Sequence, residues 1–326
     1  MRRRLLATGV LFVFAAASGG CRGAQSALNP HGPEARELAW LFWFFLAILA
    51  AVWFAVVAAL LFALIRRRFP VREHSMTRIV GALVGATAII LLVLTGLSYR
   101  TQSQLYGQEV TAPVTIHLTG HQWWWEIEYE SSNPSQTFTT ANEIHVPLNR
   151  QIRLKLTSSD VIHSFWVPTV FGKMDLIPGV KNEIRFTVDK PGVLRGQCAE
   201  FCGFQHAHMS LLLIAEDPAT FAKWRNSQLR SRLPPASSEG EKIFLGKPCA
   251  TCHTIRGTPA GGRFGPDLTH FGSRKTIAAG TLLLTRGAIA GWIVDPQSTK
   301  PGANMPAVDL TPQETLALTD YLEGLR

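Results

Sequence analysis

The sequence has few charged residues for its length, and this scarcity limits what the chain can be. Only 17% of its 326 residues are Asp, Glu, Lys or Arg, whereas 47% are hydrophobic. This balance is unusual for a soluble protein and indicates membrane segments. The formal net charge is +9, but the arginines cluster beside apolar runs, at 2–4 and 66–68, and no basic stripe follows downstream. We therefore expect no binding to nucleic acid.

Cysteine is also scarce, and none is left over for a structural disulfide. The five cysteines form three groups: Cys21, then Cys198 and Cys202, then Cys249 and Cys252. Each group adjoins residues that suggest a different chemical role, so the chain does not resemble a small secreted domain held together by disulfides.

Residues 1–21 resemble an export signal, with three arginines, an apolar run over 5–17 and small residues at 18–20. Cys21 directly follows and resembles the lipidated cysteine of a bacterial lipoprotein. Ser18 stands where that motif usually carries leucine, so an ordinary signal with an incidental cysteine is the alternative.

Two apolar runs follow, over 38–65 and 79–99. The first is about 42 Å long as a helix and the second has about 20 residues, so each can span a bilayer. Residues 66–78 between them carry five arginines and one glutamate. The positive-inside rule puts this loop in the cytoplasm and the later chain outside. We expect a transmembrane helical hairpin within 22–100.

Residues 110–214 change to a strand-like pattern. Apolar and polar residues alternate over 114–119, 151–157 and 181–188, with proline and glycine between these runs. Many short strands in about 100 residues are typical of a β-sandwich. We expect this domain over 101–225.

One loop of this domain gathers soft metal ligands. Cys198, Cys202, His206 and Met209 have the spacing C-x3-C-x3-H-x2-M, and His163 lies upstream. Thiolate, thioether and imidazole together select copper, and the spacing is too cramped for a zinc finger. The two cysteines alone favour a disulfide in an exported domain. The neighbouring histidines and methionine favour a copper electron-transfer centre.

Proline, serine and arginine predict a linker over 226–238, followed by a third unit over 239–326. There, C-x-x-C-H is the haem-attachment motif, in which Cys249 and Cys252 form thioethers and His253 binds the iron. A thioredoxin-like motif is the alternative, but it lacks the histidine and needs a βαβ setting.

Met305 is the expected second axial ligand of that iron. It is the one methionine after the motif, and short helical segments between the two can wrap a porphyrin. A His/Met iron has the raised potential of a cytochrome c. His270 is the competing ligand. Thr311 and Pro312 predict the start of a terminal helix, as N-cap and first helical residue.

With these motifs in view, residues 80–215 resemble subunit II of a haem-copper cytochrome c oxidase, and the appended cytochrome resembles that of the caa3-type enzymes. The motifs that carry the resemblance are Gly120–Trp125, Asp160–Pro168, Lys173–Asp175 with Pro178 and Gly179, and Cys198–Met209. The resemblance implies a multidomain chain: a transmembrane α-helical hairpin, a cupredoxin-like β-sandwich and an all-α class I cytochrome c domain.

The resemblance also implies a binuclear copper centre, CuA, and one covalent haem c. Its copper ligands would be the bridging thiolates of Cys198 and Cys202, the imidazoles of His163 and His206, and two weak axial ligands, the Met209 sulfur and the Glu200 carbonyl. The Glu200 side chain would face a magnesium ion at the boundary with subunit I. Trp123 would be the residue where electrons enter.

The function implied is the electron-input subunit of a terminal oxidase in the bacterial cytoplasmic membrane, with its CuA and cytochrome domains on the outer face. Cytochrome c would donate electrons, subunits I and III would be membrane partners, and subunit I would reduce O2 to water. This chain lacks the multi-histidine membrane helices needed for that reduction.

Two other functions stay open: a subunit of a nitric oxide reductase-type complex, and a membrane-tethered redox carrier or copper-delivery module. The two-span hairpin and the modest number of histidines argue against nitrous oxide reductase. The complete copper ligand set argues against a quinol-oxidising relative. One departure from the resemblance is the acidic residue that starts the second membrane helix in many relatives. Arg78 stands at that place, and Glu73 is out of register.

Overall fold

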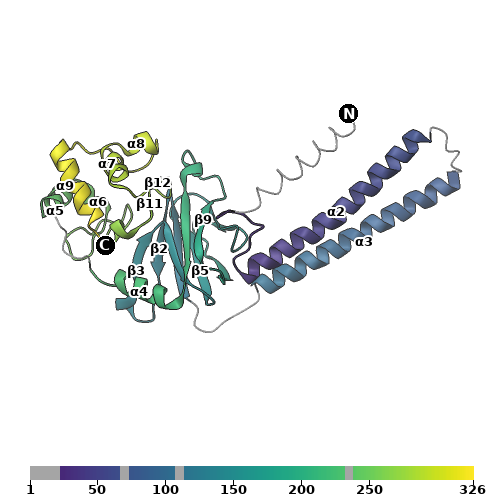
Figure 1. The fold of residues 1–326 in the computed structure, drawn as a ribbon, viewed down its shortest axis with the longest axis horizontal. Helices are drawn as coiled ribbons and strands as arrows, with labels where there is room; N and C mark the ends of the chain where they lie inside the picture. Colours follow the sequence, from purple (N-terminus) through teal and green to yellow (C-terminus); the bar gives the residue numbers. More distant parts are fainter. Residues whose placement is uncertain (1–22, 67–72, 107–113, 232–237) are drawn as a thin grey trace, which may run out of the picture. The chain divides into compact units, whose positions relative to one another are not determined.

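The computed structural model describes residues 23–66, 73–106, 114–231 and 238–326 (Figure 1). The predicted signal with Cys21, and residues 232–237 of the predicted linker, lie outside these residues. The chain divides into two compact units, residues 34–109 and the remainder. The second unit contains both the β-domain and the C-terminal domain.

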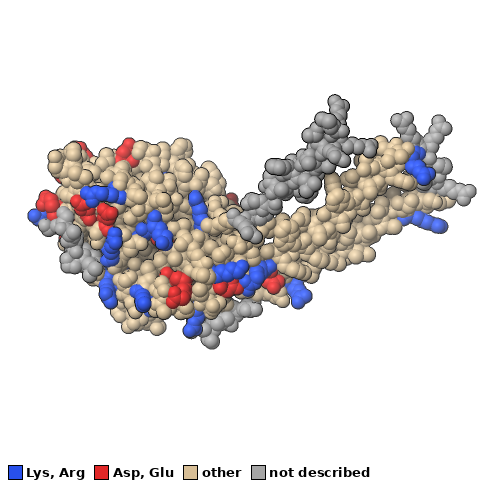
Figure 2. Space-filling view, viewed as in Figure 1, with Lys and Arg blue, Asp and Glu red and all other residues tan. Residues whose placement is uncertain are grey.

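The first unit is a pair of long helices, α2 (Pro33–Ile65) and α3 (Glu73–Tyr106). Both are long and apolar enough to cross a membrane. Large apolar side chains such as Trp53 and Leu92 lie exposed, and Figure 2 shows uncharged surface over most of the hairpin. A helix satisfies its own backbone hydrogen bonds, which is what an apolar solvent requires. The expected helical hairpin is confirmed, and each helix is longer than the apolar run that predicted it.

The β-domain contains ten strands. In chain order they are β1 (Val114–His121), β2 (Trp124–Tyr129), β3 (Phe138–Ala141), β4 (Glu143–Pro147), β5 (Gln151–Ser158), β6 (His163–Trp166), β7 (Met174–Leu176), β8 (Asn182–Thr187), β9 (Gly192–Cys198) and β10 (Ser210–Glu216). One five-stranded sheet has the order β3-β2-β1-β5-β8 and the other the order β4-β10-β9-β6-β7. The expected β-sandwich is confirmed.

The alternation in the sequence explains these strands. Along β5, Ile152, Leu154 and Leu156 are buried, whereas Arg153 and Lys155 between them are half-buried. Successive side chains of a strand point to opposite faces, so one face enters the core. Each fully buried aliphatic side chain contributes about 1.5–3 kcal/mol.

Strand pairing brings the candidate ligands together. β9 and β10 are antiparallel neighbours, and the loop that joins them carries the predicted copper ligands. β6 pairs with β9 so that Phe165 lies opposite Cys198. His163 begins β6 and therefore lies beside the same loop.

The predicted linker begins too early. Helix α4 (Pro218–Gln228) includes its first residues, 226–228, and the next helix begins at Ser238. The side chain of Asp217 caps α4, and the Trp224 ring stacks on His145 at 4.0 Å between ring centroids. The polar sequence of this stretch suggests a linker, but capping and aromatic packing keep it helical.

The C-terminal domain is helical, with one short β-ribbon that the sequence does not predict. Its elements are α5 (Ser238–Gly246), α6 (Cys249–Cys252), η4 (Phe271–Ser273), β11 (Thr276–Ile277), β12 (Leu282–Leu283), α7 (Arg286–Val294), α8 (Pro296–Thr299) and α9 (Pro312–Glu323). The predicted start of α9 is confirmed, since Thr311 and Glu314 form a capping box. A Cβ on Gly240 of α5 would collide with the Ala317 carbonyl of α9, so these two helices require glycine at their contact.

Candidate copper and haem centres

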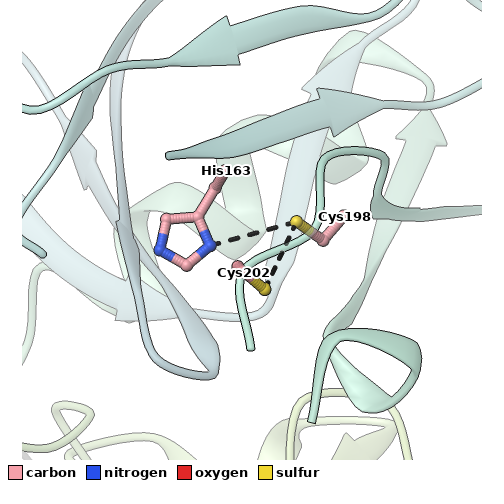
Figure 3. Close-up of side chains that lie close together, drawn as sticks. All are labelled: His163, Cys198 and Cys202. Atoms are coloured by element: carbon pink, nitrogen blue, oxygen red, sulfur yellow. Dashed lines mark hydrogen bonds between the residues drawn. The ribbon is translucent and has the colours of Figure 1, made fainter. Parts of the chain in front are cut away.

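Three buried ligand atoms form the centre of the first candidate site. The His163 Nδ1 atom lies 3.9 Å from the Cys198 sulfur, which lies 3.8 Å from the Cys202 sulfur (Figure 3). All three residues are at most 3% exposed. Figure 3 shows the imidazole and both thiols pointing toward one another. The strand pairing and the loop thus assemble residues that are 35 positions apart in sequence.

The other three predicted copper ligands lie around these atoms. The Cys202 sulfur is 3.6 Å from His206 Nδ1 and 3.8 Å from the Met209 sulfur. The Cys198 sulfur is 3.2 Å from the Glu200 carbonyl oxygen. The structure therefore brings all six predicted ligands together. We call residues 198–209 the copper loop.

The donor set fits copper. Both cysteines are free thiols, and their sulfurs lie 3.8 Å apart. Two sulfurs bound to one metal at about 2.3 Å with a tetrahedral angle would lie about 3.8 Å apart. Two thiolates, two imidazoles and a thioether in a buried site are the ligands of a soft metal.

Asp160 orients the first histidine, a role that sequence analysis did not assign. Its Oδ1 atom accepts a 2.8 Å hydrogen bond from His163 Nε2, which leaves Nδ1 facing the sulfurs. Burial would raise the pKa of Asp160, but hydrogen bonds from His163, Val161 and Gln122 outweigh it and lower that pKa. The sequence could have indicated this role, because Asp160 lies three residues before His163 in the same motif.

The two thiols share one hydrogen bond, and this sets them apart electrostatically. That bond lowers the pKa of Cys198 far below its ordinary value, with further help from His163. The same bond, together with burial, raises the pKa of Cys202. A metal that binds both sulfurs as thiolates would displace the proton that the pair shares.

Trp123 contacts the copper loop directly. Its Nε1 atom donates a 3.0 Å hydrogen bond to the Cys202 carbonyl, and the Gln122 side chain donates to the same oxygen at 2.7 Å. Gly203 permits this approach, because its φ is +110° and a Cβ there would meet both side chains. The predicted electron-input residue is thus bonded to a predicted copper ligand.

The Glu200 side chain is paired within the chain. Its carboxylate accepts a 2.9 Å hydrogen bond from Lys173, and this bond raises the pKa of Lys173. Among the described residues, the group with metal-binding geometry is His163, Cys198 and Cys202. A magnesium ion at Glu200 would therefore need ligands from another chain.

The second candidate site is an apolar cavity in the C-terminal domain, and the predicted haem ligands Cys249, Cys252, His253 and Met305 line it. The His253 Nδ1 atom donates a 2.8 Å hydrogen bond to the Pro266 carbonyl, which leaves Nε2 free for iron. Burial lowers the pKa of His253, which favours the neutral imidazole that binds a metal. The cavity and its donors fit a haem.

The competing axial ligand points elsewhere. His270 Nε2 lies 3.1 Å from the Arg230 carbonyl, and His270 is not part of the cavity lining. Met305 lines the cavity, and Gln297 holds its carbonyl with a 3.0 Å hydrogen bond. This arrangement favours Met305.

The cavity extends to the β-domain. Besides residues of the C-terminal domain, Gln122, Trp123, Trp124 and Asn142 line it. Trp123 therefore borders the cavity and also binds the copper loop.

Comparisons with known proteins match two families along this chain. The family "Cytochrome C oxidase subunit II, periplasmic domain" matches residues 131–215, and cytochrome c matches residues 237–326. A cytochrome c oxidase subunit 2 from Alkalihalophilus pseudofirmus is 32% identical, covering 94% of this chain and 93% of that relative. The one from Bacillus subtilis is 31% identical, covering 68% of this chain and 64% of that relative. The crystal structure of the periplasmic domain of subunit II from Bradyrhizobium japonicum shares 34% identity over 37% of this chain and 96% of that chain, with a TM-score of 0.35.

Proposed function

Since this chain belongs to the cytochrome c oxidase subunit 2 family, we propose that it is the electron-input subunit of a haem-copper terminal oxidase. It receives electrons from a cytochrome c at its own haem and passes them through a binuclear copper centre to subunit I. Subunit I carries the site where O2 is reduced to water.

The observation that carries this proposal is the shared position of Trp123. Its ring lines the cavity that contains the haem ligands, and its Nε1 atom donates to the carbonyl of Cys202. The haem cavity and the copper loop are thus neighbours across one side chain. Electron transfer between haem and copper needs this adjacency, which a copper-delivery module has no reason to build.

Each residue of the relay has a proposed task. Cys249 and Cys252 attach the haem covalently, while His253 and Met305 bind its iron. The bound haem and copper supply one-electron redox chemistry. The buried ligands of the copper loop keep water away and keep the site rigid, so that little geometry changes when an electron arrives or leaves. Electrons enter the β-domain at Trp123. We call the β-domain the copper domain and the C-terminal domain the cytochrome domain.

The remaining proposals concern the membrane. Helices α2 and α3 span the cytoplasmic membrane with their connecting loop inside, and the other domains lie on the outer face. A lipid on Cys21 adds a second anchor. Subunits I and III are the partners of the hairpin. The Glu200 carboxylate faces a magnesium ion shared with subunit I.

Purification of the whole membrane complex tests this function. Two coppers and one haem c per copy of this chain are expected, with O2 consumed when reduced cytochrome c is supplied. A copper-free chain with a Cys198–Cys202 disulfide would overturn the proposal. Consumption of NO in place of O2 would assign the chain to a nitric oxide reductase-type complex, and isolation without a large catalytic subunit would indicate a tethered carrier.

A further inference from the structure

Lys300 is a buried cation between the two redox sites. It is only 3% exposed, and its Nζ atom donates to three backbone carbonyls. These are Trp123 at 2.8 Å, His208 at 2.9 Å and Ala278 at 3.4 Å. The first two belong to the copper domain and the third to the cytochrome domain.

The chemistry of this contact is demanding. A lysine ammonium has three N–H donors and no acceptor, and here each donor has one carbonyl partner. A buried charge is costly unless it is fully hydrogen-bonded. The ammonium therefore has all three hydrogen bonds only when Trp123, the copper loop and the cytochrome domain lie together in this arrangement.

The positions of these partners in the sequence give the contact its meaning. His208 lies between the predicted copper ligands His206 and Met209, and Lys300 lies five residues before the predicted haem ligand Met305. We call residues 300–305 the Met305 segment. Lys300 therefore connects the loop that holds copper to the segment that holds the haem iron.

A second hydrogen bond joins the same two pieces of chain. The Gln205 side chain donates to the Pro301 carbonyl at 2.8 Å. Gln205 directly precedes the copper ligand His206, and it is 3% exposed. The Met305 segment is thus bonded to the copper loop on both sides of one copper ligand.

Two more contacts tie the domains together away from the Met305 segment. The Ser210 amide donates to the Ala279 carbonyl at 3.0 Å. The buried Glu143 carboxylate accepts from the Lys275 and Thr276 amides at 2.7 and 2.9 Å. These contacts can hold the domains together in general, whereas Lys300 acts at the point where the two ligand segments meet.

We propose that Lys300 is a positioning residue for electron transfer within the chain, a role that rests on the proposed function. Its ammonium holds the Met305 segment against the Trp123 carbonyl and the copper loop, and this fixes the separation of the two redox centres. The step moves one electron from reduced haem iron to the oxidised copper centre, and it requires no other reactant.

The test compares Lys300→Met with a matched control, Lys247→Met, in the whole complex. Lys247 also donates to a backbone carbonyl, that of Asp309 at 2.9 Å, but its partners all lie within the cytochrome domain. After rapid photoreduction of the haem, its reoxidation by copper is followed by absorbance. Lys300→Met is expected to slow this step by about tenfold or more, because a set of charged hydrogen bonds is lost. Lys247→Met should leave it unchanged.

Hydrogen exchange provides a readout that does not depend on electron transfer. The Ser210 amide reports on the contact between the domains, and it should exchange faster in Lys300→Met and at the wild-type rate in Lys247→Met. Reduction of the haem by external cytochrome c should be the same in all three proteins.

The outcomes separate the two proposals. A wild-type complex that lacks copper or haem, or in which haem does not reduce copper, defeats the proposed function. A wild-type relay with unchanged reoxidation and exchange in Lys300→Met defeats the role of Lys300 alone. Should Lys300→Met lose a cofactor, Lys300→Gln, which retains an amide donor, replaces it with an intermediate rate expected. Cofactor loss in both variants would also overturn the proposal, because Lys300 would then be a folding residue.

Discussion

The copper loop and the haem cavity present their ligands in different ways. In the copper loop the Cys202 sulfur lies within 4 Å of the ligand atoms of Cys198, His206 and Met209, and three of these four side chains are almost fully buried. In the haem cavity Cys249, Cys252, His253 and Met305 are half-buried and face a hollow. A small ion needs its ligands in contact, whereas a porphyrin needs them apart around an apolar space. The copper site is therefore formed by contacts among its own ligands, whereas the haem site is formed by the residues that line the cavity.

The largest expected effect is the loss of copper binding with the haem site unchanged. Cys202→Ser removes the sulfur that contacts Cys198, His206 and Met209. Changes to residues that merely support a ligand cost about 10–100-fold in metal affinity, so loss of a bridging sulfur should cost more than 100-fold. Copper per chain and the electron paramagnetic resonance of the centre measure this.

The reciprocal variant serves as the control. Cys249→Ser should weaken covalent haem attachment and leave the copper content at the wild-type level. Loss of copper in Cys249→Ser, or full copper in Cys202→Ser, would contradict the independence of the two sites.

A variant with a smaller expected effect tests whether hydrogen bonds organise the copper site. Asp160→Asn keeps the shape of the side chain but weakens its hydrogen bond to His163 Nε2. We expect copper to bind about 10–100-fold more weakly, with normal haem content. Competition with a copper chelator gives the affinity, and Asp175→Asn is the comparison, since Asp175 contacts Lys173 on the surface. Equal affinity in the two variants would rule out the orienting role of Asp160.

The cytochrome domain can be destabilised through the packing of its helices, without changing a haem ligand. Gly240→Ala puts a Cβ against the Ala317 carbonyl where α5 crosses α9, and it should destabilise the cytochrome domain by about 1–3 kcal/mol. Gly246→Ala, in the same helix, meets no atom within 4 Å and is the matched control. Thermal unfolding followed at the haem band measures both. An equal shift in the two variants would mean that helix propensity, not crowding, is responsible.

The smallest expected effect lies at the edge of the copper domain. Arg153 and Arg185 donate to Glu183, at 2.7 and 2.8 Å. Burial would raise the pKa of Glu183, but these arginines outweigh it and lower that pKa. A carboxyl with a lowered pKa stabilises the fold above its unfolded pKa, about 4.3, and this contribution is lost as the pH falls further.

Glu183→Gln should therefore cost less than about 1 kcal/mol at neutral pH, because such pairs are partly solvated. Denaturant unfolding of the variant and the wild type should differ at pH 7 and converge at low pH. A constant difference across the pH range would exclude the ion pair as its source.

The candidate copper ligands could be proposed from the sequence because most of them lie in one short loop. The spacing of Cys198, Cys202, His206 and Met209 already indicates a soft metal site, and the family resemblance supplied Glu200. His163 was found because its own motif is recognisable, although only strand pairing brings it to the loop. The haem motif is likewise local, and Met305 was proposed because no other methionine follows that motif.

Other features were missed because they depend on packing. Asp217 and Pro218 signal the start of α4, but nothing in the polar composition of 226–228 shows that the helix continues to Gln228. The ribbon of β11 and β12 has two residues in each strand, too few for a periodic signal. Nothing in the sequence around Lys300 distinguishes it from a surface lysine, because its burial depends on the contact between two domains.

The sequence by itself determined the ligand types, the order of the domains and the two apolar helices, because each of these is written in a local run of residues. The tertiary structure alone decided which groups meet across that order: Asp160 with His163, Trp123 between the copper loop and the haem cavity, and Lys300 among three carbonyls. The physical reason is that a hydrogen bond or a buried charge depends on position in space, and distances in sequence do not specify it.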